Sequence, residues 1–167
     1  MPPSSTEPRE ELARELQEAK NHLRLSYRGL SEEEMTRRGA VGEWSVKDVL
    51  SHVTSWEEVL LPDLARIARG DTPVLASMNL ETANFDPFNA MIMSLRRDLP
   101  LDQVLRELDL SHADVMEALA RLADATLAAG QFARFVLQIT ADHDREHAQG
   151  IRQWHQAEGA VQHVARG

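Results

Sequence analysis

Two histidines in the C-terminal third of the chain, His143 and His147, are spaced so that they could share one ligand. On an α-helix, residues four positions apart lie about 40° apart around the axis and one turn apart along it. Apolar residues recur at helical spacing from Phe132 to Trp154, and both imidazoles fall on this apolar face. Two buried imidazoles need polar partners. The pattern predicts either a metal site or two core histidines that hydrogen-bond to neighbouring groups.

A third histidine, His52, lies at the margin of the apolar face of an earlier predicted helix. If that helix packs beside the one that carries His143 and His147, three imidazoles meet, and catalytic zinc sites use such a set with water as the fourth ligand. The alternative for His52 is a half-buried surface histidine. The chain has no cysteine, so any metal must be held by nitrogen and oxygen. The other histidines lack these features and are predicted to be exposed to solvent: His22, His112, His155 and His163.

The elements that must position these histidines are helices. Helical periodicity predicts four long amphipathic helices over about residues 8–28, 46–69, 101–128 and 131–156. Ser45 is predicted to cap the second helix, with Asp48 at its third position. Turn-forming residues fill 71–87, a long connection that could arch over one end of the bundle, and 88–97 is weakly helical. Strand-like alternation is nowhere sustained, so the prediction is an all-α bundle.

Length and composition limit the classes of protein to consider. The 167 residues predict one domain, 1–167, with an ordered core of about 8–156 that is large enough to bury a hydrophobic interior. The formal net charge of −9 repels a phosphate backbone, so the sequence predicts no nucleic-acid partner. No stretch reaches the length of an apolar membrane span, and the N-terminus is polar and acidic. These features predict a soluble, cytoplasmic protein without a membrane partner.

Two stretches resemble the DinB/YfiT-like superfamily of bacterial metal-binding four-helix bundles. Residues 43–57 begin Glu-Trp-Ser-Val-Lys-Asp-Val-Leu-Ser-His and are similar to the family's Trp-Ser-x-x-Asp-x-x-x-His at the start of helix two. Residues 142–151 are similar to its His-x-x-x-His on the last helix. The resemblance implies a bundle with a long crossover connection, often a homodimer. It also implies one divalent metal ion, nickel, zinc, iron or manganese, held by His52, His143 and His147.

The family resemblance also implies a choice of functions. Relatives include transferases and isomerases that use low-molecular-weight thiols, hydrolase-like proteins and a genotoxin-resistance branch. The expected function is therefore a metal-dependent thiol S-transferase or hydrolase acting on a small electrophilic compound in detoxification or stress, with a low-molecular-weight thiol as possible co-substrate. The alternative is a non-enzymatic metal-binding, stress-associated bundle that forms a homodimer. A ferritin-like oxygen-activating bundle is discounted because Glu-x-x-His does not occur.

No general base can be assigned from the sequence. Asp142, Asp144 and Glu146 flank the histidine pair, yet none points squarely in its direction around the helix, and Asp144 and Glu146 are expected to orient neighbours or form surface pairs. Asp86 and Asn89 are expected at the mouth of the pocket, by analogy only. Metal binding requires unprotonated histidines, so affinity is expected to fall as the pH drops through about 6.5.

Overall fold

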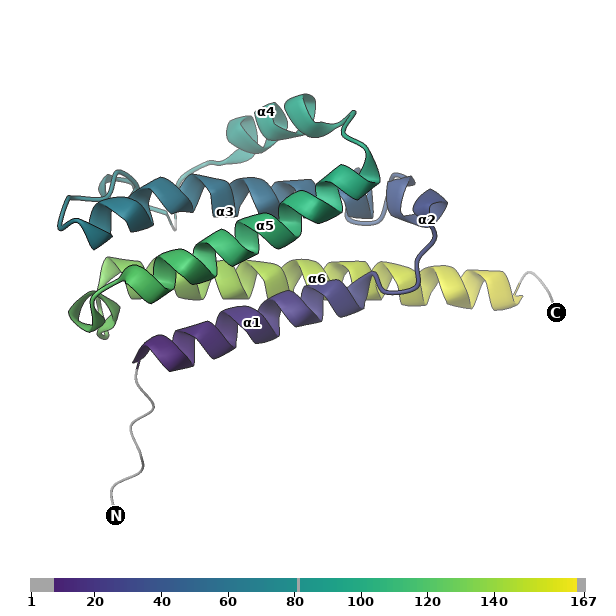
Figure 1. Ribbon diagram of the computed structural model, residues 1–167. Coiled ribbons are helices and arrows are strands. Elements are labelled where there is room, and N and C mark those ends of the chain that lie inside the picture. The colour runs from purple at the N-terminus through teal and green to yellow at the C-terminus, as the bar shows by residue number, and fades with distance from the viewer. Residues whose placement is uncertain (1–7, 81, 165–167) are drawn as a thin grey trace, which may run out of the picture.

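A computed structural model shows a bundle of helices and describes residues 8–80 and 82–164, with side chains described through residue 158. The described residues contain no β-strand, which confirms the all-α prediction (Figure 1). Two 3₁₀ turns, η1 (Leu75–Ser77) and η2 (Asp124–Leu127), lie in connections. The α-helices are α1 (Pro8–Ser26), α2 (Glu32–Thr36), α3 (Val46–Ala68), α4 (Asp86–Arg96), α5 (Leu101–Arg121) and α6 (Phe132–Val164).

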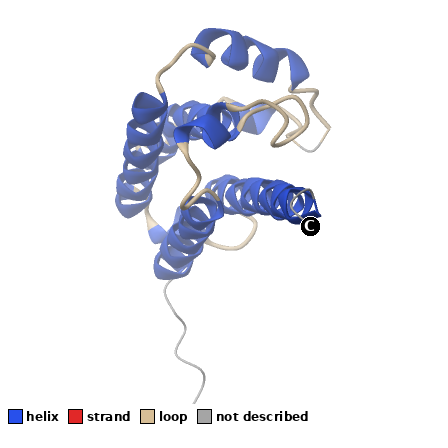
Figure 2. Ribbon diagram, turned by 90° about the vertical axis from the view of Figure 1, so that its right-hand side faces the viewer, coloured by secondary structure: helices blue, strands red, loops and turns tan. Residues whose placement is uncertain are grey.

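The four long helices, α1, α3, α5 and α6, lie side by side, and the shorter α4 covers the outer side of α3 (Figures 1 and 2). The most extensive contacts are between α1 and α6 and between α3 and α5, and α3 also contacts α6. In Figure 1, α3 and α5 run in the same direction, so the chain has to return along the bundle between them. The segment that contains η1 and α4 makes this return and is the long crossover that the resemblance implied.

The start of α3 is fixed by a capping box. Ser45 Oγ accepts a hydrogen bond from the backbone of Asp48 (3.1 Å), and the Asp48 carboxylate accepts one from the backbone of Ser45 (2.9 Å). Both bonds satisfy donors that a helix start leaves without partners. Gly42, at a φ of 58°, allows the tight turn that brings the chain into this start. The predicted N-cap is therefore confirmed, and it sets the position of His52 two turns later.

Two predicted helix ends are wrong. The third predicted helix was expected to reach residue 128, but α5 ends at Arg121, and Leu122 has extended backbone angles. Arg9 from α1 donates a hydrogen bond to the Leu122 carbonyl, and η2 then buries Leu127, so tertiary contacts replace the last helical turns. The last predicted helix was expected to end near residue 156, whereas α6 continues through Gly159 to Val164. A single glycine disfavours a helix by only about 1 kcal/mol and does not stop it.

The buried apolar side chains form two clusters, one toward each end of the bundle. In each long helix, a buried polar residue separates the positions that belong to one cluster from those that belong to the other. These residues form a polar layer across the bundle: Lys20 of α1, Glu57 of α3, Ser111 and His112 of α5, and Asp144 of α6. None of the described helices is both long enough and apolar enough to cross a membrane.

Candidate metal centre

The three histidines singled out in the sequence come together between α3 and α6. One ring nitrogen from each of His52, His143 and His147 lies within 4.8 Å of the other two. The Nε2 atom of His143 is 2.9 Å from that of His52 and 3.0 Å from that of His147. The three rings meet edge to face, with centroids 4.4 to 5.1 Å apart. The predicted convergence of the two helices on one point is thus present.

Local structure explains why the rings converge. His143 and His147 are one turn apart on the same face of α6, and α3 packs against that face. Trp44, just before the capped start of α3, packs on the His52 ring with centroids 5.0 Å apart. His52 is only 5% exposed. The ring of His52 thus lies between the Trp44 indole and the histidines of α6, largely shielded from solvent.

Burial keeps the imidazoles uncharged. Burial, with a smaller contribution from the neighbouring imidazoles, lowers the pKa of His52 to about 3 and that of His143 to about 2. Burial also lowers the pKa of His147. All three rings are therefore neutral at physiological pH and offer lone pairs to a cation. The expectation that protons compete with a metal near pH 6.5 is revised, since competition in this folded site begins at a lower pH.

The donor set fits a divalent cation. The Nε2 of a neutral imidazole carries either one hydrogen or one lone pair. The Nε2 of His143 therefore cannot form a good hydrogen bond with the Nε2 of His52 and another with the Nε2 of His147. Three lone pairs directed at one shared cation remove this conflict. Imidazole nitrogen suits zinc, nickel and iron, and the nitrogen set does not by itself exclude manganese.

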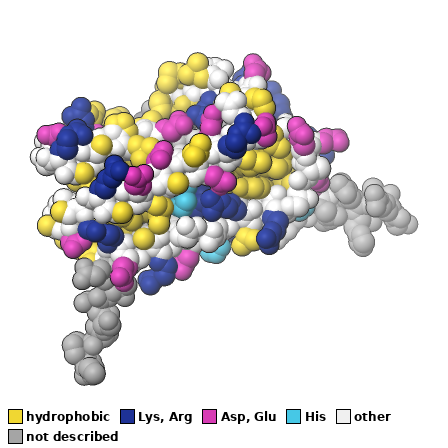
Figure 3. All heavy atoms as spheres, viewed as in Figure 1, with side chains coloured by type: hydrophobic (Ala, Val, Ile, Leu, Met, Phe, Trp, Pro, Cys, Tyr) yellow, Lys and Arg dark blue, Asp and Glu magenta, His cyan; other side chains and the backbone are white. Residues whose placement is uncertain are grey.

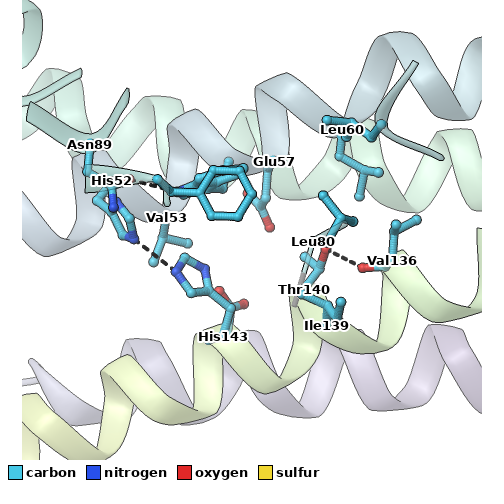
Figure 4. A pocket seen from close by; sticks show the side chains of 14 residues that line it. His52, Val53, Glu57, Leu60, Leu80, Asn89, Val136, Ile139, Thr140 and His143 are labelled. Carbon is cyan, nitrogen blue, oxygen red and sulfur yellow. Dashed lines mark hydrogen bonds between the residues drawn. The ribbon is translucent and has the colours of Figure 1, made fainter. Parts of the chain in front are cut away.

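A cavity of about 270 Å³ adjoins the histidines between α3 and α6. Figure 4 shows His52 and His143 at one end of it, the Glu57 carboxylate between the helices, and aliphatic side chains at the other end. The crossover closes over it: Phe85 packs edge-on against Trp56, and the Trp56 indole donates a hydrogen bond to Asn89. Asn89 lines the cavity as expected, whereas Asp86 is not among its lining residues. The aliphatic end is formed by Leu60, Leu80, Val136 and Ile139.

Two carboxylates of the polar layer, Glu57 and Asp144, also line this cavity. Each forms an ion pair with Lys20 at 2.9 Å, and all three side chains are at most 2% exposed. Ser111 donates a hydrogen bond to the second oxygen of Glu57. His112 Nδ1 is 3.8 Å from Glu57, too far for a hydrogen bond. The wall of the cavity therefore contains a buried cluster of charges beside the histidines.

The two carboxylates differ in their acidity. Burial alone would raise the pKa of Glu57, but the nearby His112 side chain, the Lys20 charge and the hydrogen bond from Ser111 together lower it below its ordinary value. Burial raises the pKa of Asp144 above its ordinary value, although Lys20 opposes this effect. Glu57 is therefore the more firmly ionised of the two.

The sequence did not indicate this cluster correctly. Asp144 was expected to orient a neighbour or form a surface pair, but it is buried against Lys20. His112 was predicted to be exposed and is only 5% exposed. His22 and His155 are exposed as predicted, and the side chain of His163 lies outside the described residues. One signal was available, because Lys20 falls on the apolar face of its helix, in line with buried leucines.

Comparisons with known proteins place this geometry in a family context. Residues 15–151 match the family model described as the DinB superfamily. No curated protein matches the sequence significantly. The fold is similar to that of the colibactin self-resistance protein ClbS, crystallised in complex with a dsDNA, with a TM-score of 0.76, 12% identity, and coverage of 91% of this chain and 98% of that one.

Two further solved structures share the fold. One is described as the sibling lethal factor precursor DfsB, with a TM-score of 0.75, 13% identity, and coverage of 90% of this chain and 96% of that one. The other is an uncharacterised protein from Escherichia coli UTI89, with a TM-score of 0.69, 15% identity, and coverage of 93% and 97%. At these identities the likeness concerns the fold alone.

The prediction that nucleic acid is not a partner is contradicted by the ClbS structure, in which a protein of this fold is in complex with a dsDNA. The argument from net charge failed because −9 is a sum over the whole chain, whereas phosphate contacts depend on where basic side chains lie. On the face in Figure 3, Lys and Arg are interspersed with Asp and Glu. The net charge of the whole chain therefore does not exclude nucleic acid as a partner of this surface.

Proposed function

Because this chain belongs to the DinB superfamily, we propose that it binds one divalent metal ion through His52, His143 and His147 and acts as a metal-dependent thiol S-transferase or hydrolase on a small electrophilic compound. The observation that supports this proposal best is the meeting of three ring nitrogens within 4.8 Å at the end of a cavity, one from the buried His52 and two from the half-buried His143 and His147. A histidine triad without a cavity would support metal storage or a structural role. A triad that opens into a cavity supports chemistry on a bound compound.

Each part of the cavity has a role in this function. A bound divalent ion would supply Lewis acidity and lower the pKa of a coordinated thiol or water. The aliphatic end, formed in part by Leu60 and Val136, holds an apolar portion of the substrate away from water. The Trp56 and Phe85 rings close the cavity from the crossover side. A volume of about 270 Å³ is just below the range of about 300–1,000 Å³ that is typical for ligand pockets, which favours a small substrate.

The metal content of the protein, purified without a nickel column, tests the proposal. Wild type is compared with His52→Ala, His143→Ala and His147→Ala, and His155→Ala is the matched control because it is an exposed histidine on the same helix. We expect about one metal ion per chain in wild type and control, and loss of the ion in the other three while helicity persists. The metal found then directs a screen of low-molecular-weight thiols and electrophiles, and light scattering tests the homodimer.

Two results would contradict the proposal. A wild-type protein that neither contains a metal nor takes up zinc, nickel, iron or manganese at neutral pH would leave the triad as core histidines. Full metal occupancy without turnover of any thiol or ester substrate would instead favour the alternative of a non-enzymatic metal-binding bundle.

A second candidate function is a resistance role exerted on DNA. It is favoured by the shared fold with ClbS, which is described as a self-resistance protein and was crystallised with a dsDNA. A mobility-shift assay with a short DNA duplex at two salt concentrations tests it. Binding through phosphate contacts weakens as salt rises, and the slope of log affinity against log salt concentration is proportional to the number of phosphates contacted. No shift at low salt would remove this candidate.

A further inference from the structure

The polar layer carries an unbalanced negative charge. Lys20 supplies one positive charge, and Glu57 and Asp144 supply two negative ones, so the three groups sum to −1 while each side chain is at most 2% exposed. The one other titratable residue of the layer is His112, both of whose ring nitrogens lack hydrogen-bond partners among the described residues. Buried net charge is unfavourable unless something nearby compensates for it.

The unbalanced charge lies beside the histidine triad. Asp144 directly follows His143 in α6, and both carboxylates line the same cavity as His52 and His143. The Oδ1 atom of Asp144 is buried and has no hydrogen-bond partner among the described residues. Among the described residues, no Lys or Arg lines that cavity. The protein therefore places a carboxylate charge without its own counter-ion next to three neutral nitrogen donors.

We infer that the excess carboxylate of the Lys20, Glu57 and Asp144 cluster is the built-in counter-charge of the divalent cation that the histidine triad binds. This inference rests on the proposed function, because it requires a cation at the triad. Neutral imidazoles leave the full charge of a divalent ion uncompensated, and a nearby negative charge in a poorly screened interior lowers its energy without coordinating it. In the metal-free protein the same negative charge is uncompensated and lowers the free energy of unfolding. The cluster therefore increases metal affinity and reduces the stability of the metal-free protein.

Asp144→Asn tests this inference because it removes one negative charge and leaves Lys20 and Glu57 as a neutral pair. We expect the dissociation constant for Zn²⁺ to rise by about 10- to 100-fold, the usual effect of changing groups that surround metal ligands. Metal-free stability should stay at or above the wild-type value. Zn²⁺ affinity is measured at pH 8 by competition with a chromophoric chelator, and metal-free stability by urea unfolding in excess EDTA.

Asp142→Asn is the matched control. Asp142 precedes His143 by one residue, carries the same charge on the same helix, and is exposed at the surface in an ion pair with Arg145. Solvent screens it, so the Zn²⁺ dissociation constant should change less than threefold. Glu57→Gln is a second test variant that keeps an acceptor for Ser111, and it should act in the same direction as Asp144→Asn.

The possible outcomes separate the inference from the proposed function. Equal Zn²⁺ affinities for wild type and both test variants would overturn the inference alone, as would equal weakening by Asp144→Asn and Asp142→Asn. Parallel loss of Zn²⁺ affinity and metal-free stability in the test variants would also overturn it, because that pattern shows a structural role only. Failure of the wild type to bind Zn²⁺ would overturn the proposed function, and the inference with it.

Discussion

Replacing Lys20 by methionine tests the charge cluster by removing its positive charge instead of one of its negative charges. The Lys20 side chain is completely buried and pairs with Glu57 and Asp144, both at 2.9 Å. Methionine fills a similar volume, so the main change is the loss of one positive charge, which leaves two carboxylates buried together. Breaking a buried ion pair typically destabilises a protein by about 3–5 kcal/mol. We expect a loss in that range in the metal-free protein, a large part of the roughly 5–15 kcal/mol that holds a typical domain folded.

The pH dependence of this loss has a definite sign. Burial already raises the pKa of Asp144, and Lys20 is the main group that opposes this rise, so without Lys20 the folded state holds Asp144 at a pKa further above that of the unfolded chain. The folded variant then binds more protons than its unfolded form, so its stability relative to wild type falls as the pH rises. The difference between wild type and Lys20→Met should therefore be largest near pH 8 and shrink toward pH 5. Adding Glu57→Gln and Asp144→Asn to the variant should recover most of the loss, because no buried charge is left uncompensated.

Urea unfolding followed by far-ultraviolet circular dichroism measures these differences, with EDTA present throughout. Arg24→Met is the control: Arg24 lies one turn further along α1, and its ion pair with Asp109 is largely exposed. The control should lose less than about 1 kcal/mol. If Lys20→Met loses no more than the control, or if its deficit does not shrink on acidification, the idea of a buried charge cluster is refuted.

Two further predictions concern the metal-free protein. Its stability should fall as the pH drops below 6.5, because the unfolded chain then protonates histidines whose folded pKa values are lowered, to about 3 for His52 and about 2 for His143. At pH 5 each of these two histidines should account for roughly 2 kcal/mol of lost stability. Urea midpoints that do not change between pH 8 and pH 5 would contradict this prediction. Ser45→Ala removes the cap of α3 and should reduce the unfolding free energy by about 1 kcal/mol, and an unchanged midpoint in the same assay would show that the capping box adds nothing.

The helices that carry the candidate site were predictable because their signals are local. Ser45 and Asp48 cap α3 through contacts within three residues, and the apolar periodicity of α6 fixed the face on which His143 and His147 lie. The end of α5 was not predictable in this way. It is set by Arg9, which belongs to another helix and reaches the Leu122 carbonyl. Periodicity within one helix contains no information about such a contact.

The same distinction explains which site residues were found. His52, His143 and His147 combine a residue type that binds metals with a spacing that is visible along the chain. Glu57 and Asp144 have no such spacing, and their carboxylates acquire a role only through Lys20 of α1. A lysine on an apolar helix face is a detectable anomaly, since lysine is almost never fully buried unless it is paired. The anomaly predicts that a partner exists but does not say on which helix.

Both errors about charge in the sequence prediction therefore have one cause. The net charge of −9 was used to exclude nucleic acid, and Asp144 was expected to orient a neighbour or form a surface pair. Coulomb energy depends on the local dielectric and on distance, so solvent screens the interactions of an exposed charge, whereas a buried charge interacts strongly with the groups around it. Of the many acidic groups of this chain, Asp142 and Asp144 have the same charge and flank the same histidine, but Asp142 is exposed and Asp144 is buried. Only the packing of α1 against α6 makes them different, and the comparison of their two amide variants measures that difference directly.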